Sequence, residues 1–255
     1  MDSGDKKPGA RPSVVIDCFP TSAQRYRDGY AIVAIDVIRA TTTAVTAASL
    51  GWRCFPTASL ETAVPLAARL PNPLLAGELG GNMPYGFEMT NSPSEIAMRT
   101  DIQRPMILLS SSGTQLLAEA NGCDVTYAAC LRNHSAQAHH LVGRHQHVAV
   151  IGAGSRNEFR EEDQLCCAWI AEALMQAGYQ PENAETERIV SQWSGAKPEA
   201  FLGSNSVEYL RRTGQVHDLY FTLDHVDDLS AVFVLKDNEI VMTPVMREQP
   251  RRDAA

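Results

Sequence analysis

Acidic, basic and hydroxyl side chains gather where a buried strand gives way to a helix early in the chain. The apolar run at 31–35 is followed by Asp36 and Arg39, and the helical pattern after them opens with three hydroxyl residues, Thr41, Thr42 and Thr43. A helix N-terminus offers free amide N–H groups and the positive end of the helix dipole, which favour anions. The segment therefore predicts one wall of a phosphate site. The alternative is structural, because Asp and Thr are ordinary capping residues and Arg39 could pair with Asp36.

The second candidate segment is a glycine-rich stretch at 77–93. Glu78 directly follows a predicted short strand, and Asn91 and Ser92 precede the proline that opens the next helix. A long stretch without regular structure is usually functional or disordered, and its aromatic and apolar content argues against disorder. Glu78 is thus a candidate metal ligand or general base, and Asn91 and Ser92 are candidate substrate ligands. A purely structural role, bridging the loop backbone, stays open for Glu78 and Asn91.

Two further segments join a strand to a helix. At 110–114, backbone amides and hydroxyls could hold an oxyanion, with Ser112, Gly113 and Thr114 as the candidates. At 152–163, Gly152 and Gly154 resemble half of a dinucleotide fingerprint, but Asn157 stands where the third glycine belongs; we count the two glycines among the candidate phosphate-binding residues. Glu162 and Asp163 open the helix after them, where carboxylates suit both the helix dipole and Mg²⁺.

Several phosphatase and hydrolase chemistries are excluded by spacing. Cys18 and Arg25 are one residue too far apart for the C-x5-R loop of thiol phosphatases, and Asp36-Val-Ile is not a D-x-D motif. The chain has no G-x-S-x-G elbow and no histidine spacing typical of a metal site. The lysine of a P-loop is also missing after the glycine-rich turns.

The elements that must position these residues alternate between strand and helix. This alternation predicts an α/β fold with three layers, α/β/α, around a largely parallel or mixed sheet. Because active sites of such folds lie at the carboxyl ends of strands, the four segments are expected to converge on one edge. Two strands around Asp237-Asn238 predict a C-terminal β-hairpin on one edge of the sheet. We expect one domain at 13–246, with flexible tails at 1–12 and 247–255.

Composition limits the classes of partner. The 255 residues carry a net charge of −8, which argues against a general nucleic-acid or anionic-membrane binder but not against a local basic pocket. No signal peptide or membrane-spanning run is evident, so we expect a cytoplasmic protein. The six cysteines lack metal-site spacing and are expected to be reduced and largely buried.

Taken together, the motifs resemble those of the 2-phosphosulfolactate phosphatase (ComB) family. They are D-V-I-R-A-T-T-T from Asp36, Gly77-Glu78, Gly86-Phe87 with Asn91-Ser92-Pro93, Ser112-Gly113-Thr114, and Phe159 with Glu162-Asp163. They occur in the family's order and span about residues 14–245. The resemblance implies an Mg²⁺-dependent phosphatase that converts 2-phosphosulfolactate to sulfolactate and phosphate, a step in coenzyme M or sulfolactate formation.

Roles for single residues follow from the resemblance and from the needs of phosphate chemistry. Asp36, Glu78 and one or both of Glu162 and Asp163 are expected to hold Mg²⁺ and to orient or deprotonate water. Arg39 is expected to clamp the phosphate or a second anion of the substrate. The segments Thr41–Thr43 and Ser112–Thr114 would form hydrogen bonds with phosphate oxygens.

Two departures from the family pattern bear on the substrate. Ser112 replaces the usual family Asn, and Glu88, Met89 and Thr90 differ from the form often seen before Asn91. The alternatives are therefore a phosphatase for another small organic-acid phosphate, or a non-catalytic relative that binds an anion. We expect a small anionic phosphate ester as the ligand and a homodimer as the assembly.

Overall fold

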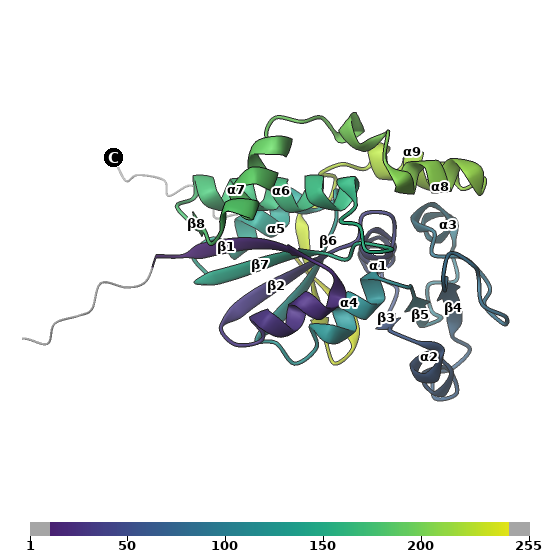
Figure 1. The fold of residues 1–255 in the computed structure, drawn as a ribbon. Helices are drawn as coiled ribbons and strands as arrows, with labels where there is room; N and C mark the ends of the chain where they lie inside the picture. The colour runs from purple at the N-terminus through teal and green to yellow at the C-terminus, as the bar shows by residue number, and fades with distance from the viewer. Residues whose placement is uncertain (1–10, 245–255) are drawn as a thin grey trace, which may run out of the picture.

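A single mixed sheet forms the centre of the computed structural model, which describes residues 11–244 (Figure 1). Its ten strands run in the order β4-β5-β3-β10-β9-β6-β2-β7-β1-β8. Their bounds are β1 Ser13–Cys18, β2 Tyr30–Ile35, β3 Cys54–Thr57, β4 Leu74–Gly77, β5 Met106–Leu109, β6 Val125–Ala129, β7 His147–Gly152, β8 Gln180–Pro181, β9 Ala231–Lys236 and β10 Glu239–Pro244. The pairs of β1, β2, β6 and β7 and of β3, β4 and β5 are parallel.

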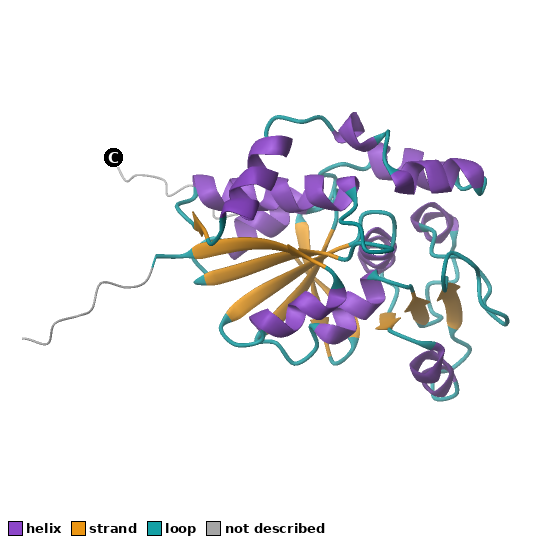
Figure 2. Cartoon of the chain, in the orientation of Figure 1, coloured by secondary structure: helices purple, strands orange, loops and turns teal. Residues whose placement is uncertain are grey.

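Helices cover both faces of this sheet (Figures 1 and 2). They are α1 Ala40–Ser49, α2 Leu60–Ala67, α3 Pro93–Met98, α4 Gly113–Glu119, α5 His134–Leu141, α6 Glu161–Gln176, α7 Ala184–Trp193, α8 Asn205–Arg212 and α9 Val216–Asp224, with the 3₁₀ turns η1 Pro20–Tyr26 and η2 Pro198–Phe201. Helices α5, α6 and α7 pack on one face, and α1 and α4 pack on the other. The predicted three-layer α/β/α class with a mixed sheet is confirmed.

Strand β2 lies inside the sheet, between β6 and β7, and its side chains supply both cores. Val33 and Ile35 pack into the core under α5 and α6, whereas Ile32 and Ala34 pack into the core under α1 and α4. All four are fully buried. A strand covered on both faces must be apolar at successive positions, which is why its sequence is a continuous run rather than an alternation. The first polar residue after the run, Asp36, therefore emerges at the carboxyl edge of the sheet.

The C-terminal hairpin is present, but its predicted place on an edge was wrong. Strand β9 pairs antiparallel with β6, and β10 pairs antiparallel with β3, so the hairpin lies inside the sheet and joins two parallel groups of strands. Its turn at Asp237 and Asn238 has φ of 51° and 61°, the left-handed pair of a type I′ turn. The apolar run 231–235 fits an interior position, because both of its faces are covered.

Helix α6 begins at Glu161, which agrees with the prediction that Glu162 and Asp163 open a helix. The sequence reading missed α7 and the short strand β8. Within residues 11–244 no helix is long and apolar enough to cross a membrane. All six cysteines fall in this range and form no disulfide there; five of them are buried. The predicted tails lie outside the described residues, apart from residues 11 and 12, and the division into one domain and two tails stays a prediction.

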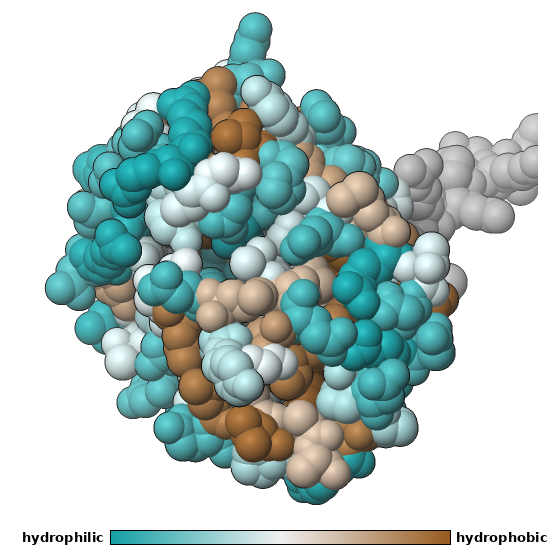
Figure 3. Space-filling model, turned by 90° about the vertical axis from the view of Figure 1, so that its right-hand side faces the viewer, coloured by the Kyte–Doolittle hydropathy of each residue, from teal (hydrophilic) through white to brown (hydrophobic). Residues whose placement is uncertain are grey.

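Figure 3 views the molecule from the side of β4 and α2, and hydrophobic side chains gather on part of that face. Large exposed apolar residues of α2, of α3 and of the loops before and after α3 include Val64, Met83, Tyr85, Met98 and Ile102. Polar residues occupy the remainder of the view.

Candidate active site

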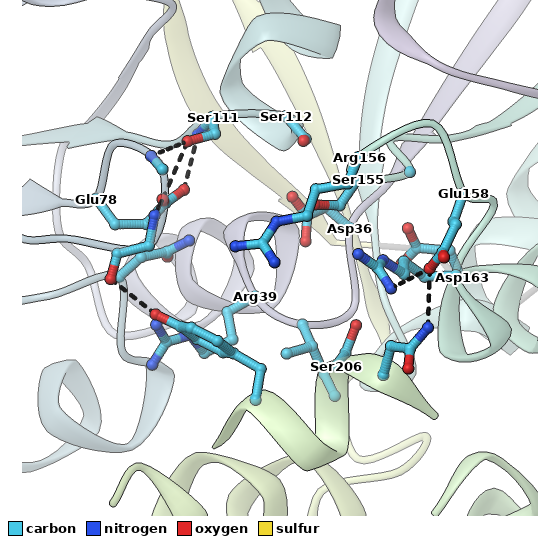
Figure 4. A pocket seen from close by; sticks show the side chains of 18 of the residues that line it. Asp36, Arg39, Glu78, Ser111, Ser112, Ser155, Arg156, Glu158, Asp163 and Ser206 are labelled. Atoms are coloured by element: carbon cyan, nitrogen blue, oxygen red, sulfur yellow. Dashed lines mark hydrogen bonds and ion pairs between the residues drawn. The ribbon is translucent and has the colours of Figure 1, made fainter. Parts of the chain in front are cut away.

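A pocket of about 540 Å³ opens at the carboxyl ends of the strands, and all four predicted segments contribute to it. Asp36 and Arg39 come from the loop after β2, Glu78 from the loop after β4, Ser112 from the loop after β5, and Asp163 from the start of α6. Helix α8 supplies a fifth wall with Asn205, Ser206, Glu208, Tyr209 and Arg212. Figure 4 shows the labelled side chains of these walls around one common space.

Asp36 is fixed in the pocket by its backbone neighbours. The Thr41 hydroxyl donates to the Asp36 carbonyl at 2.8 Å and accepts from the Asp36 N–H at 2.9 Å. Gly113 lies against the carboxylate: a Cβ on Gly113 would stand 2.2 Å from Asp36 Oδ2 and 2.6 Å from the Ala40 Cβ. A side chain at 113 therefore cannot coexist with Asp36 in this position. The glycine that opens α4 is explained by this close approach.

Burial and neighbouring carboxylates raise the pKa of two acidic side chains of the pocket, Asp36 and Asp163. Burial raises the pKa of Asp36 to about 7, and the charges of Glu78 and Glu162 add to the rise, against the Ala40 N–H and Arg39. Burial also raises the pKa of Asp163 well above its usual range, with Asp36 and Glu162 as further causes. Such repulsion between buried carboxyl groups marks a place that binds a proton or a cation favourably.

Glu162 and Asp163 are adjacent but point to different surroundings. Asp163 lines the pocket and accepts the Val37 N–H at 2.8 Å. Glu162 is buried behind it and is not a lining residue; burial raises its pKa, and hydrogen bonding from Ser206 and Ser204 opposes the rise. Its Oε2 atom has no hydrogen-bond partner among the described residues.

Glu78 connects two loops at the pocket wall. Its oxygens accept the Ser111 N–H at 2.7 Å, the Ser111 hydroxyl at 3.0 Å and the Gly81 N–H at 2.7 Å (Figure 4). The glycine before it, Gly77, allows this approach, because a Cβ there would stand 2.1 Å from the Leu109 carbonyl oxygen. Glu78 is thus both a lining carboxylate and the acceptor that organises the loops after β4 and β5.

Arg39 pairs with a residue that the sequence analysis did not consider. Its NH1 lies 2.5 Å from Asp218 Oδ2, and both side chains are buried. The alternative ion pair of Arg39 with Asp36 is not formed. Asp218 belongs to α9, and its other oxygen accepts the Ser92 hydroxyl at 2.6 Å. Ser92 therefore bonds Asp218 and caps α3 by accepting the Glu95 N–H, whereas its neighbour Asn91 lines the pocket with a buried, unpartnered Oδ1.

The hydroxyls of the threonine and serine motifs serve the local backbone in the structure. Thr42 donates to the Val37 carbonyl at 2.7 Å, and Thr114 donates to the Ser110 carbonyl at 2.9 Å. Thr43 is buried with an unpartnered hydroxyl. None of Thr41, Thr42, Thr43 and Thr114 lines the pocket, whereas Ser112 does. This geometry favours support of the loops by the threonines, and phosphate contact by them stays a prediction.

The two candidate glycines differ in position. Gly154 lines the pocket at a φ of 60°, and its N–H bonds to Asp163. Gly152 does not line the pocket; it ends β7 and lies against the ring of Phe159.

Sequence reasoning missed the residues of α8 and three arginines. Arg156 and Arg160 lie within the predicted segment 152–163, and Arg212 ends α8. The available signal for Arg156 and Arg160 was their clustering in one predicted segment of a chain of net charge −8. The contribution of α8 had no comparable signal, since its amphipathic pattern predicts a helix but not which loops the helix covers.

The oxygen ligands of the pocket fit Mg²⁺ that is bound through only a few protein side chains. Within residues 11–244, no group of three Asp, Glu, His or Cys side chains is arranged to hold a metal. The pocket does offer the carboxylates of Asp36 and Asp163 and the unpartnered Oδ1 of Asn91. Mg²⁺ commonly binds through one or two carboxylates and completes its shell with water and substrate phosphate.

The chain is similar over most of its length to proteins that share one description. The family model described as 2-phosphosulpholactate phosphatase matches residues 19–238. A "Probable 2-phosphosulfolactate phosphatase" of Deinococcus radiodurans is 30% identical over 80% of this chain and 85% of its own. Proteins of the same description from Synechococcus sp. and Symbiobacterium thermophilum are 31% and 29% identical, over 79% and 84% of this chain and 85% and 94% of their own.

Proposed function

The chain belongs to the 2-phosphosulfolactate phosphatase family, and we propose that it hydrolyses 2-phosphosulfolactate to sulfolactate and phosphate with the help of Mg²⁺. The observation that carries the proposal is the pocket itself. It places buried carboxyl groups of raised pKa, Asp36 and Asp163, within one space lined by guanidinium groups. This combination suits a phosphate monoester, which needs positive charge around its oxygens and acidic groups around the attacking water.

Asp36 and Asp163 would hold the Mg²⁺. When bound, the ion would offset charge on the phosphate oxygens and on attacking water. The raised pKa of both carboxyl groups supports the assignment, because a cation relieves the repulsion that burial and like charges create. The Asn91 Oδ1 offers a further uncharged oxygen ligand in the same pocket.

The chain's other residues bind the ester and position the water. Arg39 donates to the phosphate oxygens through N–H groups that the single bond to Asp218 leaves free. Ser112 offers its hydroxyl, which does not cap α4. Glu78, fixed by three hydrogen bonds, orients the attacking water and accepts its proton.

The reaction balances without an oxidant or a further substrate. The water oxygen forms a bond to phosphorus, and the bond between phosphorus and the ester oxygen breaks. The ester oxygen leaves with the electron pair and gains a proton from solvent, which gives the hydroxyl of sulfolactate, and Glu78 returns to solvent the proton that it accepted from the attacking water. Because Asp36 and Asp163 are buried, electrostatic interactions of their carboxyl groups are stronger than those of exposed groups.

Phosphate release from 2-phosphosulfolactate by the purified protein tests the proposal. We expect hydrolysis by the wild type, its loss in Asp36→Asn, and its retention in Asp28→Asn, which makes the same charge change at an exposed residue outside the pocket. Equal hydrolysis by the wild type and Asp36→Asn would remove Asp36 from the site. No hydrolysis of this ester, with hydrolysis of another, would replace the proposed substrate.

A further inference from the structure

Four guanidinium groups line the pocket, and they divide into two kinds. Arg39 is paired with Asp218, and Arg160 NH1 lies 2.5 Å from Glu158 Oε2. The other two, Arg156 and Arg212, form no ion pair with any residue in the part of the chain that the structure describes. Glu208 lies one turn before Arg212 on α8, and it does not pair with Arg212 either. Among the arginines that line the pocket, Arg156 and Arg212 are thus the two without a carboxylate partner in the described residues.

Arg156 is carried by a tight two-residue turn that directs it toward the pocket. Ser155 and Glu158 exchange both backbone hydrogen bonds, at 2.9 and 3.0 Å, and the turn between them has φ of 51° at Arg156 and 61° at Asn157. Asn tolerates this left-handed conformation, but an arginine there is uncommon and costs free energy. Figure 4 shows the Arg156 side chain extending from the turn into the space between Asp36 and Glu78.

The helix that ends at Arg212, an exposed residue, is anchored to two loops of the pocket. At one side, Asn205 Nδ2 donates to Glu158 Oε2 at 2.9 Å, which connects α8 to the turn that carries Arg156. At the other side, the Tyr209 hydroxyl donates to the Gly81 carbonyl at 2.7 Å, which connects α8 to the loop after Glu78. The helix therefore spans two loops of the pocket, and Arg156 and Arg212 belong to one connected wall.

We propose that Arg156 and Arg212 form an anion subsite for the substrate's carbon skeleton, apart from the residues that act on the phosphate. The inference rests on the proposed function and assigns recognition of the ester's sulfonate or carboxylate group to Arg156 and Arg212. A guanidinium presents parallel N–H donors that match the oxygens of such groups. In a chain of net charge −8, two unpaired arginines in a pocket rich in acids oppose the repulsion that a polyanion would otherwise meet.

Three esters that differ by one anion at a time test the subsite. Isopropyl phosphate carries no further anion, 2-phospholactate carries a carboxylate, and 2-phosphosulfolactate carries a carboxylate and a sulfonate. We expect Arg156→Gln and Arg212→Gln each to lower kcat/KM for 2-phosphosulfolactate at least ten-fold, less for 2-phospholactate and least for isopropyl phosphate. Arg212→Lys should keep part of the activity, because it retains the charge and loses the paired donors.

Arg211→Gln is the matched control, since Arg211 is an exposed neighbour on the same helix that does not line the pocket. Its kcat/KM should stay within two-fold of the wild type for all three esters. Equal losses on the three esters in Arg156→Gln and Arg212→Gln would overturn the subsite, even where phosphatase activity is present.

Binding of the product separates the subsite from the proposed function. Calorimetry with 3-sulfolactate needs no turnover, and we expect the wild type and Arg211→Gln to bind it at least ten-fold more tightly than Arg212→Gln. If the wild type hydrolyses none of the esters but shows this difference, the proposed function fails and the subsite stands. If the wild type does not bind 3-sulfolactate, or the variants bind it equally, the subsite is overturned.

Discussion

Arg39 NH1 and Asp218 Oδ2 lie 2.5 Å apart, and both side chains are buried beneath the pocket wall. Asp218 Oδ1 also accepts the hydroxyls of Ser92 and Ser94, both at 2.6 Å. One carboxylate of α9 thus connects the arginine after β2 with the start of α3. Arg39 is thereby fixed by a residue 179 positions later in the sequence, and that residue is itself bonded to Ser92, 126 positions before it.

Replacing the carboxylate should weaken substrate binding through Arg39. We predict that Asp218→Asn raises KM for 2-phosphosulfolactate about ten-fold or more with a smaller change in kcat, because the amide cannot balance the guanidinium charge. Stability should fall by about 3 kcal/mol, the usual cost of leaving a buried ion without its partner. Steady-state kinetics and denaturant unfolding measure the two effects.

The control for this variant is Asp224→Asn, an exposed position on the same helix. A double-mutant cycle with Arg39→Met tests whether Asp218 acts on KM by positioning Arg39, because the effects of substituting two residues of one ion pair do not add. The double variant should raise KM no more than Arg39→Met alone. Additive increases in KM, or an unchanged KM in Asp218→Asn, would leave Asp218 with a structural role only.

The close approach of Gly113 and Asp36 predicts a selective loss of activity. In Gly113→Ala the new Cβ would stand 2.2 Å from Asp36 Oδ2, so the carboxylate must move. We expect kcat to fall about 100-fold, in line with the cost of misplacing a reacting group by an ångström. Gly203→Ala is the control, because nothing lies within 4 Å of its Cβ and its φ needs no glycine. Comparable kcat values in both variants would argue against a catalytic place for Asp36.

The raised pKa of Asp36 predicts how stability depends on pH in the metal-free protein. Burial lifts this pKa from 3.8 to about 7, so the folded protein binds the proton more tightly than the unfolded chain. Folding stability contributed by this group therefore falls as pH rises from about 4 to about 7. Asp36→Asn lacks this loss and should be more stable than the wild type at pH 8, by at most about 4 kcal/mol.

Denaturant unfolding of both proteins in EDTA, at pH 4 and pH 8, measures the effect. The gain from Asp36→Asn should be present at pH 8 and largely absent at pH 4. A gain of the same size at both values would mean that the Asp36 carboxyl does not titrate between them. Asp36→Asn would then lose activity while gaining stability, as is common for substitutions in active sites.

Much of the fold was predictable from the sequence, because its signals are local. The apolar run 31–35 indicated a strand covered on both faces, and the apolar and hydroxyl pattern after Asp36 indicated a helix. The place of the C-terminal hairpin was not predictable in this way. A strand's pattern reports that its faces are buried, but not which strands are its neighbours.

The site was predictable to the extent that it follows strand ends. Asp36, Glu78, Ser112 and Asp163 each come directly after a strand or open a helix, so topology brings them together. Asp218 was beyond reach, since its bond to Arg39 joins residues 179 positions apart. The same holds for Arg212, whose helix is placed over the pocket by tertiary contacts rather than by its own pattern.

The most direct test of the account is the initial rate of phosphate release from 2-phosphosulfolactate with Mg²⁺, with excess EDTA, and after Mg²⁺ is restored. Phosphorus NMR would follow the ester and the free phosphate in the same sample. We predict rapid release with Mg²⁺, at least a 100-fold slower rate in EDTA, and recovery when the ion returns. Absence of release under all three conditions, from protein that is folded and pure, would contradict the proposed activity. Rapid release that EDTA does not slow would contradict the place of Mg²⁺ between Asp36 and Asp163.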